Sequence, residues 1–324
     1  MTIKVAFLGP EGTYTHKAVL QQFRNDSSNQ IEIYPKKLID DCFTSIDSRE
    51  VDYAVVPVEN STNGQVVFTY DLLRDWFIPT STTSNTSEMP TPPNSAGSGI
   101  SSQPPKFKIV AEQFVSIQHN FLTNAKDLSK IKTIYSHPQV WTQVSQFFKS
   151  NKLDFSKVAK VDATSTSKAA EFVYHDKSNT TACIASNMSA ELYNLPIVYS
   201  NIEDNSKNTT RFLVLGYEPA PVISSPTTPP KQTPDVTSVI LTLNHDDPGA
   251  LCDVLVKFKN HNINLSSISS RPSHLKQWQY VFFIEMLADL NNNLELSHVI
   301  DDISTSCQTL VVLGSFKRSW RYYS

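Results

Sequence analysis

The stretch that decides the fold of the first part of this chain is KVAFLGPEGTYT, residues 4–15. Residues 4–8 are a short apolar run of the kind that forms a strand buried on both faces. A glycine-containing turn follows, and apolar residues then recur at helical spacing over residues 18–23. Strand, turn and helix in this order begin a doubly wound α/β unit.

The turn ends in Gly12 and Thr13, directly before the predicted helix. Threonine suits the first capping position of a helix, and Thr13 or Thr15 can fill it. Free amides at a helix N-terminus favour an anion, a carboxylate as readily as a phosphate. The turn has neither the Gly-x-Gly-x-x-Gly pattern of dinucleotide sites nor the Gly-Lys pair of a Walker loop. A simple tight turn is therefore an equal alternative to a nucleotide site.

The alternation of strand and helix continues along the first 217 residues. Further strands are predicted at residues 31–34, 53–58, 107–115, 131–136, 157–162, 182–185 and 212–215. Such alternation predicts parallel sheets. Polar loops follow strands in both halves of this region, as expected if a cleft between two lobes gathers strand ends. We therefore predict a two-lobe, doubly wound α/β domain over residues 1–217.

Two segments rich in Pro, Ser and Thr interrupt this pattern. The segment at about residues 79–106 has too few apolar residues to build a core, and it is predicted to be a disordered surface insertion. Residues 218–236 are predicted to be a linker. Beyond the linker, residues 237–324 show the order βαββαβ, which predicts a ferredoxin-like domain.

Composition excludes several classes of protein. The 324 residues carry a formal net charge of −3 and no dominant basic patch, so nucleic acid is not an expected partner. No apolar run reaches the roughly 18–20 residues that span a bilayer, so no membrane partner is expected. The cysteines Cys42, Cys183, Cys252 and Cys307 lack zinc-site spacing and are predicted to be reduced, buried thiols of a cytoplasmic protein. No metal site is predicted.

Polar side chains stand at the ends of two predicted strands. Thr210 and Arg211 open the apolar strand that contains Phe212, and Asn60 and Ser61 follow an earlier buried strand. Hydroxyls and amides there can bind a polar ligand without carrying charge. The alternative interpretation is an edge-strand threonine beside a surface cation, with Asn60 and Ser61 serving as turn residues.

Taken together, the motifs resemble those of prephenate dehydratases. The motifs, in chain order, are GPEGTY (9–14), ENS (59–61), HPQ (137–139), Ser165-Thr166 with Ala169-Ala170, and NTTRF (208–212). The tail, with GAL (249–251) and SRP (270–272), resembles the ACT domain that binds phenylalanine in that family. The resemblance covers nearly the whole chain apart from the two low-complexity segments.

The resemblance implies conversion of prephenate to phenylpyruvate, with loss of water and carbon dioxide, without cofactor or metal. It implies that Thr210 is the hydrogen-bond donor at the departing hydroxyl, with Arg211 on a substrate carboxylate and Phe212 against the ring or anchoring the loop. The other implied site residues are Asn60, Ser61 and Gln139, which orient the substrate, and Gly12, Thr13, Ser165 and Thr166, which line carboxylate pockets.

The ACT resemblance implies allosteric inhibition by L-phenylalanine bound at an interface of a homodimer or homotetramer. The implied effector residues are Asn244, Asp247, Gly249, Ala250, Leu251, Ser270, Arg271 and Pro272. Ser269 stands where the family often has an acidic residue, a departure that removes a carboxylate from this site.

Two alternatives remain at this stage. A dehydratase acting on arogenate would differ only in accepting an amine in place of a keto group. A two-lobe sensor of small carboxylates would share the fold and cleft but would have no need of the donor at Thr210.

Overall fold

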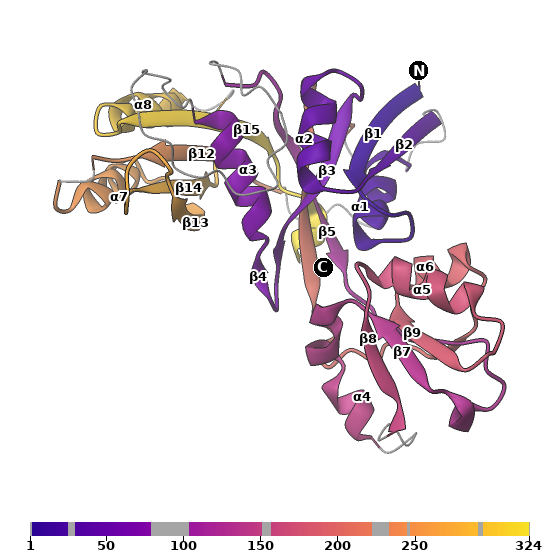
Figure 1. Cartoon of the computed structure of the whole chain (residues 1–324). Helices are drawn as coiled ribbons and strands as arrows, with labels where there is room; N and C mark the ends of the chain where they lie inside the picture. Colours follow the sequence, from indigo (N-terminus) through magenta and orange to yellow (C-terminus); the bar gives the residue numbers. More distant parts are fainter. Residues whose placement is uncertain are drawn as a thin grey trace, which may run out of the picture. The chain divides into compact units, whose positions relative to one another are not determined.

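The computed structural model describes residues 2–24, 30–78, 104–150, 157–221, 233–244, 247–290 and 294–323 (Figure 1). The greater part of the predicted insertion and of the predicted linker lies outside the described residues.

The first sheet contains the strand with which the chain begins. Its strand order is β2-β1-β3-β11-β5, and the short β4 pairs with β3. The bounds are β1 (Thr2–Leu8), β2 (Gln30–Lys36), β3 (Tyr53–Asn60), β4 (Gly64–Gln65), β5 (Lys108–Ser116) and β11 (Thr209–Gly216). β1 and β2 are parallel, and Val5, Ala6 and Phe7 in β1 are completely buried. The helices that connect these strands are α1 (Tyr14–Phe23), α2 (Ile39–Asp47) and α3 (Val67–Phe77).

The second sheet has the strand order β10-β6-β9-β7-β8. The bounds are β6 (Asn120–Leu122), β7 (Thr133–Ser136), β8 (Ala159–Asp162), β9 (Thr181–Ala185) and β10 (Ile197–Tyr199). β7 is parallel to both β8 and β9, as the alternation predicts. β6 is antiparallel to β9 and to β10, because β6 enters the sheet from β5 and not through a crossover helix. This sheet is therefore mixed.

The helices of the second sheet are short. They are α4 (Ser145–Lys149), α5 (Thr166–His175) and α6 (Asn187–Leu192), with the 3₁₀ turns η1 (Leu128–Lys130) and η2 (Pro138–Gln143). Trp141, Val144, Phe147 and Phe148 recur at helical spacing and predict one amphipathic helix, but the structure has η2 followed by α4. The break lies at Val144, whose φ of −129° and ψ of 28° are not helical.

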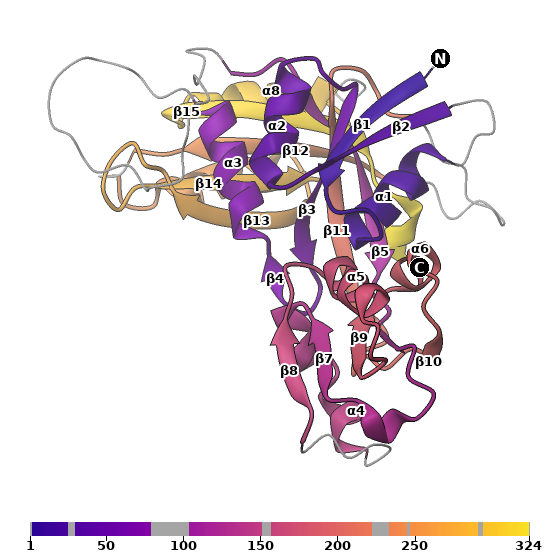
Figure 2. The ribbon, with the colours of Figure 1, turned by 45° about the vertical axis from the view of Figure 1, so that its right-hand side comes forward.

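The third sheet confirms the ferredoxin-like prediction. Its elements are β12 (Asp235–Thr242), α7 (Ala250–Asn260), β13 (Leu265–Pro272), β14 (Tyr280–Met286), α8 (Leu294–Ser304), β15 (Thr309–Lys317) and a final turn η4 (Trp320–Tyr323). Figure 2 shows the four strands side by side in the order β13-β14-β12-β15. Every neighbouring pair is antiparallel. Both helices pack on the sheet through buried residues such as Val254, Phe258 and Val299.

The chain divides into two compact units. The first comprises Met1–Cys42, Val55–Gln65 and Gln113–Phe212, and the second comprises Phe43–Ala54, Val66–Glu112 and Leu213–Ser324. All predicted active-site residues belong to the first unit, and all predicted effector residues belong to the second.

Two composition-based expectations can be compared with the structure. Among the described residues, no helix is long and apolar enough to cross a bilayer. The four cysteines are free thiols. Cys42 and Cys183 are buried as predicted. Cys307 is only half-buried, and Cys252 is exposed, because it lies on the outward side of α7.

Candidate active site

The end of β3 and the start of β11 are joined at Ser61 and Thr209. The backbone N–H of Ser61 donates to the Thr209 carbonyl oxygen at 2.8 Å. The backbone N–H of Thr209 donates in return to Ser61 Oγ at 2.9 Å. This pair of bonds places Asn60 beside Thr210, and Asn60 Nδ2 donates to Thr210 Oγ1 at 2.9 Å.

The orientation of the Asn60 amide follows from its other contacts. Its Oδ1 accepts the backbone N–H groups of Thr62 at 3.0 Å and Asn63 at 2.9 Å. The NH₂ group must therefore face Thr210, whose oxygen acts as the acceptor. The Thr210 hydroxyl proton consequently points elsewhere, and in the described part of the chain it meets no acceptor. Thr210 is half-buried, so a ligand can reach this donor.

A chain of amides continues from Asn60 into the interior. Asn60 Nδ2 also donates to Asn208 Oδ1 at 2.8 Å, and Asn208 Nδ2 donates to Gln143 Oε1 at 3.2 Å. The same oxygen of Gln143 lies 2.8 Å from His119 Nε2. Asn208 and His119 are each only 1% exposed. The chain of side chains is thus a partly buried polar network in which each member hydrogen-bonds to the next.

The glutamine in this network is Gln143, whereas the sequence resemblance implies that Gln139 is the site residue. Gln139 is exposed, and within the described residues its side chain makes no hydrogen bond. Gln143 lies at the end of the same turn, η2, and shares an oxygen with Asn208 and His119. Asn208 belongs to the motif that identifies Thr210, but His119 and Gln143 carry no local signal in the sequence.

Arg211 and Phe212 lie deeper in β11 than Thr210 does. Arg211 is 6% exposed, and its Cζ lies 5.9 Å from the ring centre of Phe114 on β5. Successive side chains of a strand point to opposite faces, so Arg211 does not share a face with Thr210. Phe212 is 1% exposed and is part of the core.

Gly12 and Thr13 form the start of α1. The Thr13 hydroxyl accepts from the His16 backbone N–H at 3.3 Å and donates to the Pro10 carbonyl at 2.9 Å, so its bonds are made within its own turn. Thr13 is therefore the helix cap that the sequence predicts. The carbonyl of Gly12 accepts from Ser186 Oγ at 3.1 Å and Ser189 Oγ at 3.0 Å.

Ser165 and Thr166 form the start of α5. Ser165 caps the helix by accepting from the Lys168 backbone N–H at 3.0 Å. Thr166 is 7% exposed. The neighbouring Ser167 donates to the carbonyl of Glu11, which joins the start of α5 to the turn before α1. The structure thus brings the Gly12 turn together with serines at the starts of α5 and α6, contacts that the sequence does not predict.

The titratable groups of the network are shifted toward their neutral forms. Burial lowers the pKa of His119, against smaller opposite effects from its bond to Gln143 and from Glu203. Burial also raises the pKa of Tyr14, which donates to the Gln118 carbonyl at 2.7 Å and lies 3.4 Å from His119 Nδ1. Both shifts favour the neutral form of the group concerned.

A cavity of about 160 Å³ lies beside Tyr14. It is lined by Tyr14, Lys17, Gln118, Ser186, Asn187, Met188 and Glu191. Burial lowers the pKa of Lys17. None of the predicted active-site residues lines this cavity, so we assign the candidate site by the geometry around Thr210 and not by the cavity.

The predicted effector residues lie in two places in the third sheet. Asn244, Asp247 and Gly249 are exposed between β12 and α7, where Gly249 adopts a φ of +91°. Ala250 is buried at the first position of α7, and Leu251 packs on the core. Ser270, Arg271 and Pro272 close β13, with Ser270 exposed and Ser269 8% exposed.

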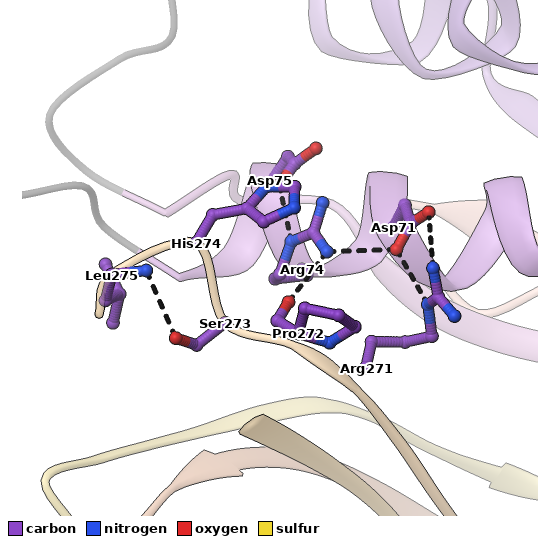
Figure 3. A network of polar contacts seen from close by, with 8 residues as sticks. All are labelled: Asp71, Arg74, Asp75, Arg271, Pro272, Ser273, His274 and Leu275. Carbon is purple, nitrogen blue, oxygen red and sulfur yellow. Dashed lines mark hydrogen bonds and ion pairs between the residues drawn. The ribbon is translucent and has the colours of Figure 1, made fainter. Parts of the chain in front are cut away.

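The end of β13 is tied to α3 by two arginines (Figure 3). Arg271 binds Asp71 in a two-pronged ion pair, with Nε and Nη2 at 2.8 and 3.1 Å from the two carboxylate oxygens. Asp71 raises the pKa of Arg271. The buried Arg74 donates to the Pro272 carbonyl at 2.8 Å, to Asp71 at 2.9 Å and to Asp75 at 2.7 Å. Arg271 is therefore already paired with a carboxylate of α3.

Comparisons with known proteins agree with this arrangement. The prephenate dehydratase family model matches residues 5–220, and the ACT domain model matches residues 238–297. A probable prephenate dehydratase of Saccharomyces cerevisiae is 36% identical over 99% of this chain and 98% of its own length. The bifunctional chorismate mutase/prephenate dehydratase of Escherichia coli strain K12 is 31% identical over 97% of this chain and 70% of its own length.

A solved structure supports the same assignment. The prephenate dehydratase of Arthrobacter aurescens in complex with L-Phe has a TM-score of 0.74 and 25% identity, covering 98% of this chain and 90% of that one. The family model alone spans well over half of the residues, and the two relatives cover nearly all of them. This chain belongs to the prephenate dehydratase family.

Proposed function

We propose that this chain converts prephenate to phenylpyruvate in L-phenylalanine biosynthesis and that L-phenylalanine inhibits it. The observation that carries the proposal is the Thr210 hydroxyl, which accepts from Asn60 and so keeps its own proton available for a ligand. A sensor of small carboxylates would not need a donor fixed in this way. The family relationship supports prephenate as the substrate. The Thr210 donor supports the proposed loss of the ring hydroxyl.

The main requirement of the reaction is a hydrogen-bond donor placed at the departing ring hydroxyl. The bond between the ring and its carboxylate carbon breaks, carbon dioxide leaves, and the electron pair enters the ring as it becomes aromatic. The ring hydroxyl departs from the opposite carbon and takes up one proton to leave as water. The hydroxyl oxygen gains negative charge as its bond breaks, so a donor there stabilises the transition state more than the bound substrate.

Thr210 fits this role as a positioned donor. A threonine hydroxyl is a very weak acid, so Thr210 relays a proton and does not supply it as a carboxylic acid would. Asn60 holds the Thr210 oxygen at 2.9 Å and thereby sets where the proton points. No charged group is hydrogen-bonded to this pair among the described residues, so the site acts through orientation and dipoles.

The remaining site residues fall into two groups. We propose that Gln143 takes the orienting role first expected of Gln139, because its NH₂ group meets no partner in the described part of the chain. Ser61 holds the start of β11 in place, and Arg211 and Phe212 stabilise the strand from within. Gly12, Thr13, Ser165 and Thr166 form the starts of α1 and α5 and are proposed to line the substrate site.

The wider organisation is also a proposal. We place the catalytic domain at residues 1–217, the linker at 218–236 and the ACT domain at 237–324. L-phenylalanine binding is assigned to the loop of residues 244–251 and to the end of β13, which lie in the segment that the ACT domain model matches. We further propose a homodimer or homotetramer that works in the cytoplasm and needs neither cofactor nor metal.

Substitution of Thr210 tests the proposed function. Thr210→Ala removes the donor and is expected to lower turnover of prephenate at least ~100-fold, the scale of losing one transition-state donor. Thr210→Ser keeps the hydroxyl and should retain most of the turnover. The matched control is Thr209→Ala, whose side chain lies outside the amide network. The assay follows phenylpyruvate by absorbance, and wild-type turnover in Thr210→Ala would refute the role of this hydroxyl.

A further inference from the structure

His119 is a buried imidazole at the inner end of the amide network. It is 1% exposed, and its Nε2 lies 2.8 Å from Gln143 Oε1. Its backbone is fixed on both sides, since its N–H donates to Glu203 Oε2 at 2.9 Å and its carbonyl accepts from Ile202 at 2.8 Å. A group that is buried and held so firmly acts on its neighbours and not on a ligand.

The direction of every bond in the network follows from Asn60. Because Asn60 Oδ1 accepts two backbone N–H groups, its NH₂ must face Asn208 Oδ1. Asn208 then turns its own NH₂ toward Gln143, so the atom of Gln143 that faces Asn208 is the carbonyl oxygen. The same oxygen faces His119, so Nε2 must carry the imidazole proton.

We propose that His119 is a positioning residue, which as the neutral Nε2–H tautomer holds the Gln143 amide with its NH₂ group toward the substrate beside Thr210. The proposal rests on the proposed function for the identity of the substrate, but not for the geometry. Two donors, His119 and Asn208, occupy both lone pairs of the Gln143 oxygen. A reversed amide would set its NH₂ against both donors, so it is excluded as long as His119 is present.

Loss of the His119 donor would leave Gln143 held by Asn208 alone. That bond is 3.2 Å long, against 2.8 Å for the bond to His119. The Gln143 side chain could then rotate, and Asn208, which also holds Asn60, would lose its fixed acceptor. Because Asn60 sets the Thr210 hydroxyl, both the amide and the hydroxyl would lose their alignment with the substrate. Misplacement by about 1 Å can cost about 100-fold in rate.

Substitutions at His119 separate a lost donor from general damage. Glutamine can place its Nε2–H near the position of the imidazole Nε2, whereas asparagine is polar but too short, and leucine is apolar. We expect kcat to fall about 10- to 100-fold in His119→Leu and His119→Asn, with KM changed less than kcat. His119→Gln should restore kcat to within about 3-fold of wild type.

A double substitution tests whether His119 acts through Gln143. If it does, His119→Asn combined with Gln143→Ala should be no slower than Gln143→Ala alone, because residues that act as one unit are not additive. Wild-type kcat in His119→Asn, or losses that multiply in the double variant, would overturn the proposal. Equal losses in the Asn and Gln variants would overturn it too, because they would indicate general damage.

A measurement without substrate separates this proposal from the proposed function. Long-range ¹H–¹⁵N spectra of the histidines in the full chain should show His119 as the neutral Nε2–H tautomer, with its Nε2 shift displaced in Gln143→Ala. An Nδ1–H tautomer, or no displacement, would contradict the positioning role even in an active enzyme. An inactive wild type with the expected spectrum would instead contradict the proposed function alone.

Discussion

At Gly12 both the backbone conformation and the neighbouring atoms disfavour a side chain. Its φ is +81°, and an added Cβ would lie 2.6 Å from Ser167 Oγ. Ser167 is held by its bond to the Glu11 carbonyl and does not move aside freely. We expect Gly12→Ala to lower the free energy of unfolding by about 2–3 kcal/mol, from strained backbone and a steric clash together.

The matched control for Gly12 is Gly64, which has a similar φ of +78° and no atom within 4 Å of an added Cβ. Gly64→Ala therefore reports the cost of the backbone conformation alone, about 1 kcal/mol. Denaturant unfolding of both variants measures the difference. Equal losses at the two positions would show that the contact with Ser167 contributes nothing to stability.

The residues of the site differ in how far the sequence predicts them. Thr210 and Asn60 stand at strand ends within recognisable motifs, and the structure joins them at 2.9 Å. Gln139 and Gln143 are one turn apart on the same segment, and only the three-dimensional path of η2 shows which of them meets the network. His119 is a lone histidine in a mostly apolar stretch, for which no sequence pattern indicates a partner.

At the scale of elements, α3 and the end of β13 are coupled by the Asp71–Arg271 pair (Figure 3). Asp71→Asn weakens the hold on Arg271, while the Arg74 bond to the Pro272 carbonyl remains. We expect uninhibited turnover to stay within about 2-fold of wild type. The concentration of L-phenylalanine for half inhibition should rise about 5-fold or more, the lower range of allosteric coupling between sites.

Asp75→Asn is the control for this coupling. Asp75 pairs with Arg74 and not with Arg271, so its loss leaves the Asp71–Arg271 pair intact. Inhibition curves for the two variants and the wild type make the comparison. An unchanged L-phenylalanine response in Asp71→Asn would show that Arg271 and α3 take no part in the inhibition.

Most helices and strands can be predicted from local hydrophobic patterns, and the strands that cannot are short. The apolar strands β1, β3 and β9 appear where apolar runs predict them, and α1 appears where apolar residues recur at helical spacing. β4 and β10 span 2 and 3 residues, too few for an alternation to be recognised. The helix predicted around Trp141 fails because periodicity does not reveal the non-helical backbone at Val144.

At the scale of the whole molecule, three sheets match what the sequence predicts: two α/β sheets followed by a ferredoxin-like domain. The alternation of strands and helices could not reveal the antiparallel β6 and β10, because the pairing of these strands depends on contacts distant in sequence. The described chain also divides into two compact units, and Val66–Glu112 groups with the C-terminal residues in the second of them.

The central claim is that the full chain is a prephenate dehydratase whose activity depends on Thr210. The most direct measurement is the absorbance of phenylpyruvate formed from prephenate by the purified full chain, with arogenate as the competing substrate. We predict rapid formation of phenylpyruvate from prephenate, slower turnover of arogenate, and inhibition by L-phenylalanine. Turnover of neither substrate would contradict the account and would favour a sensor of small carboxylates on the same fold.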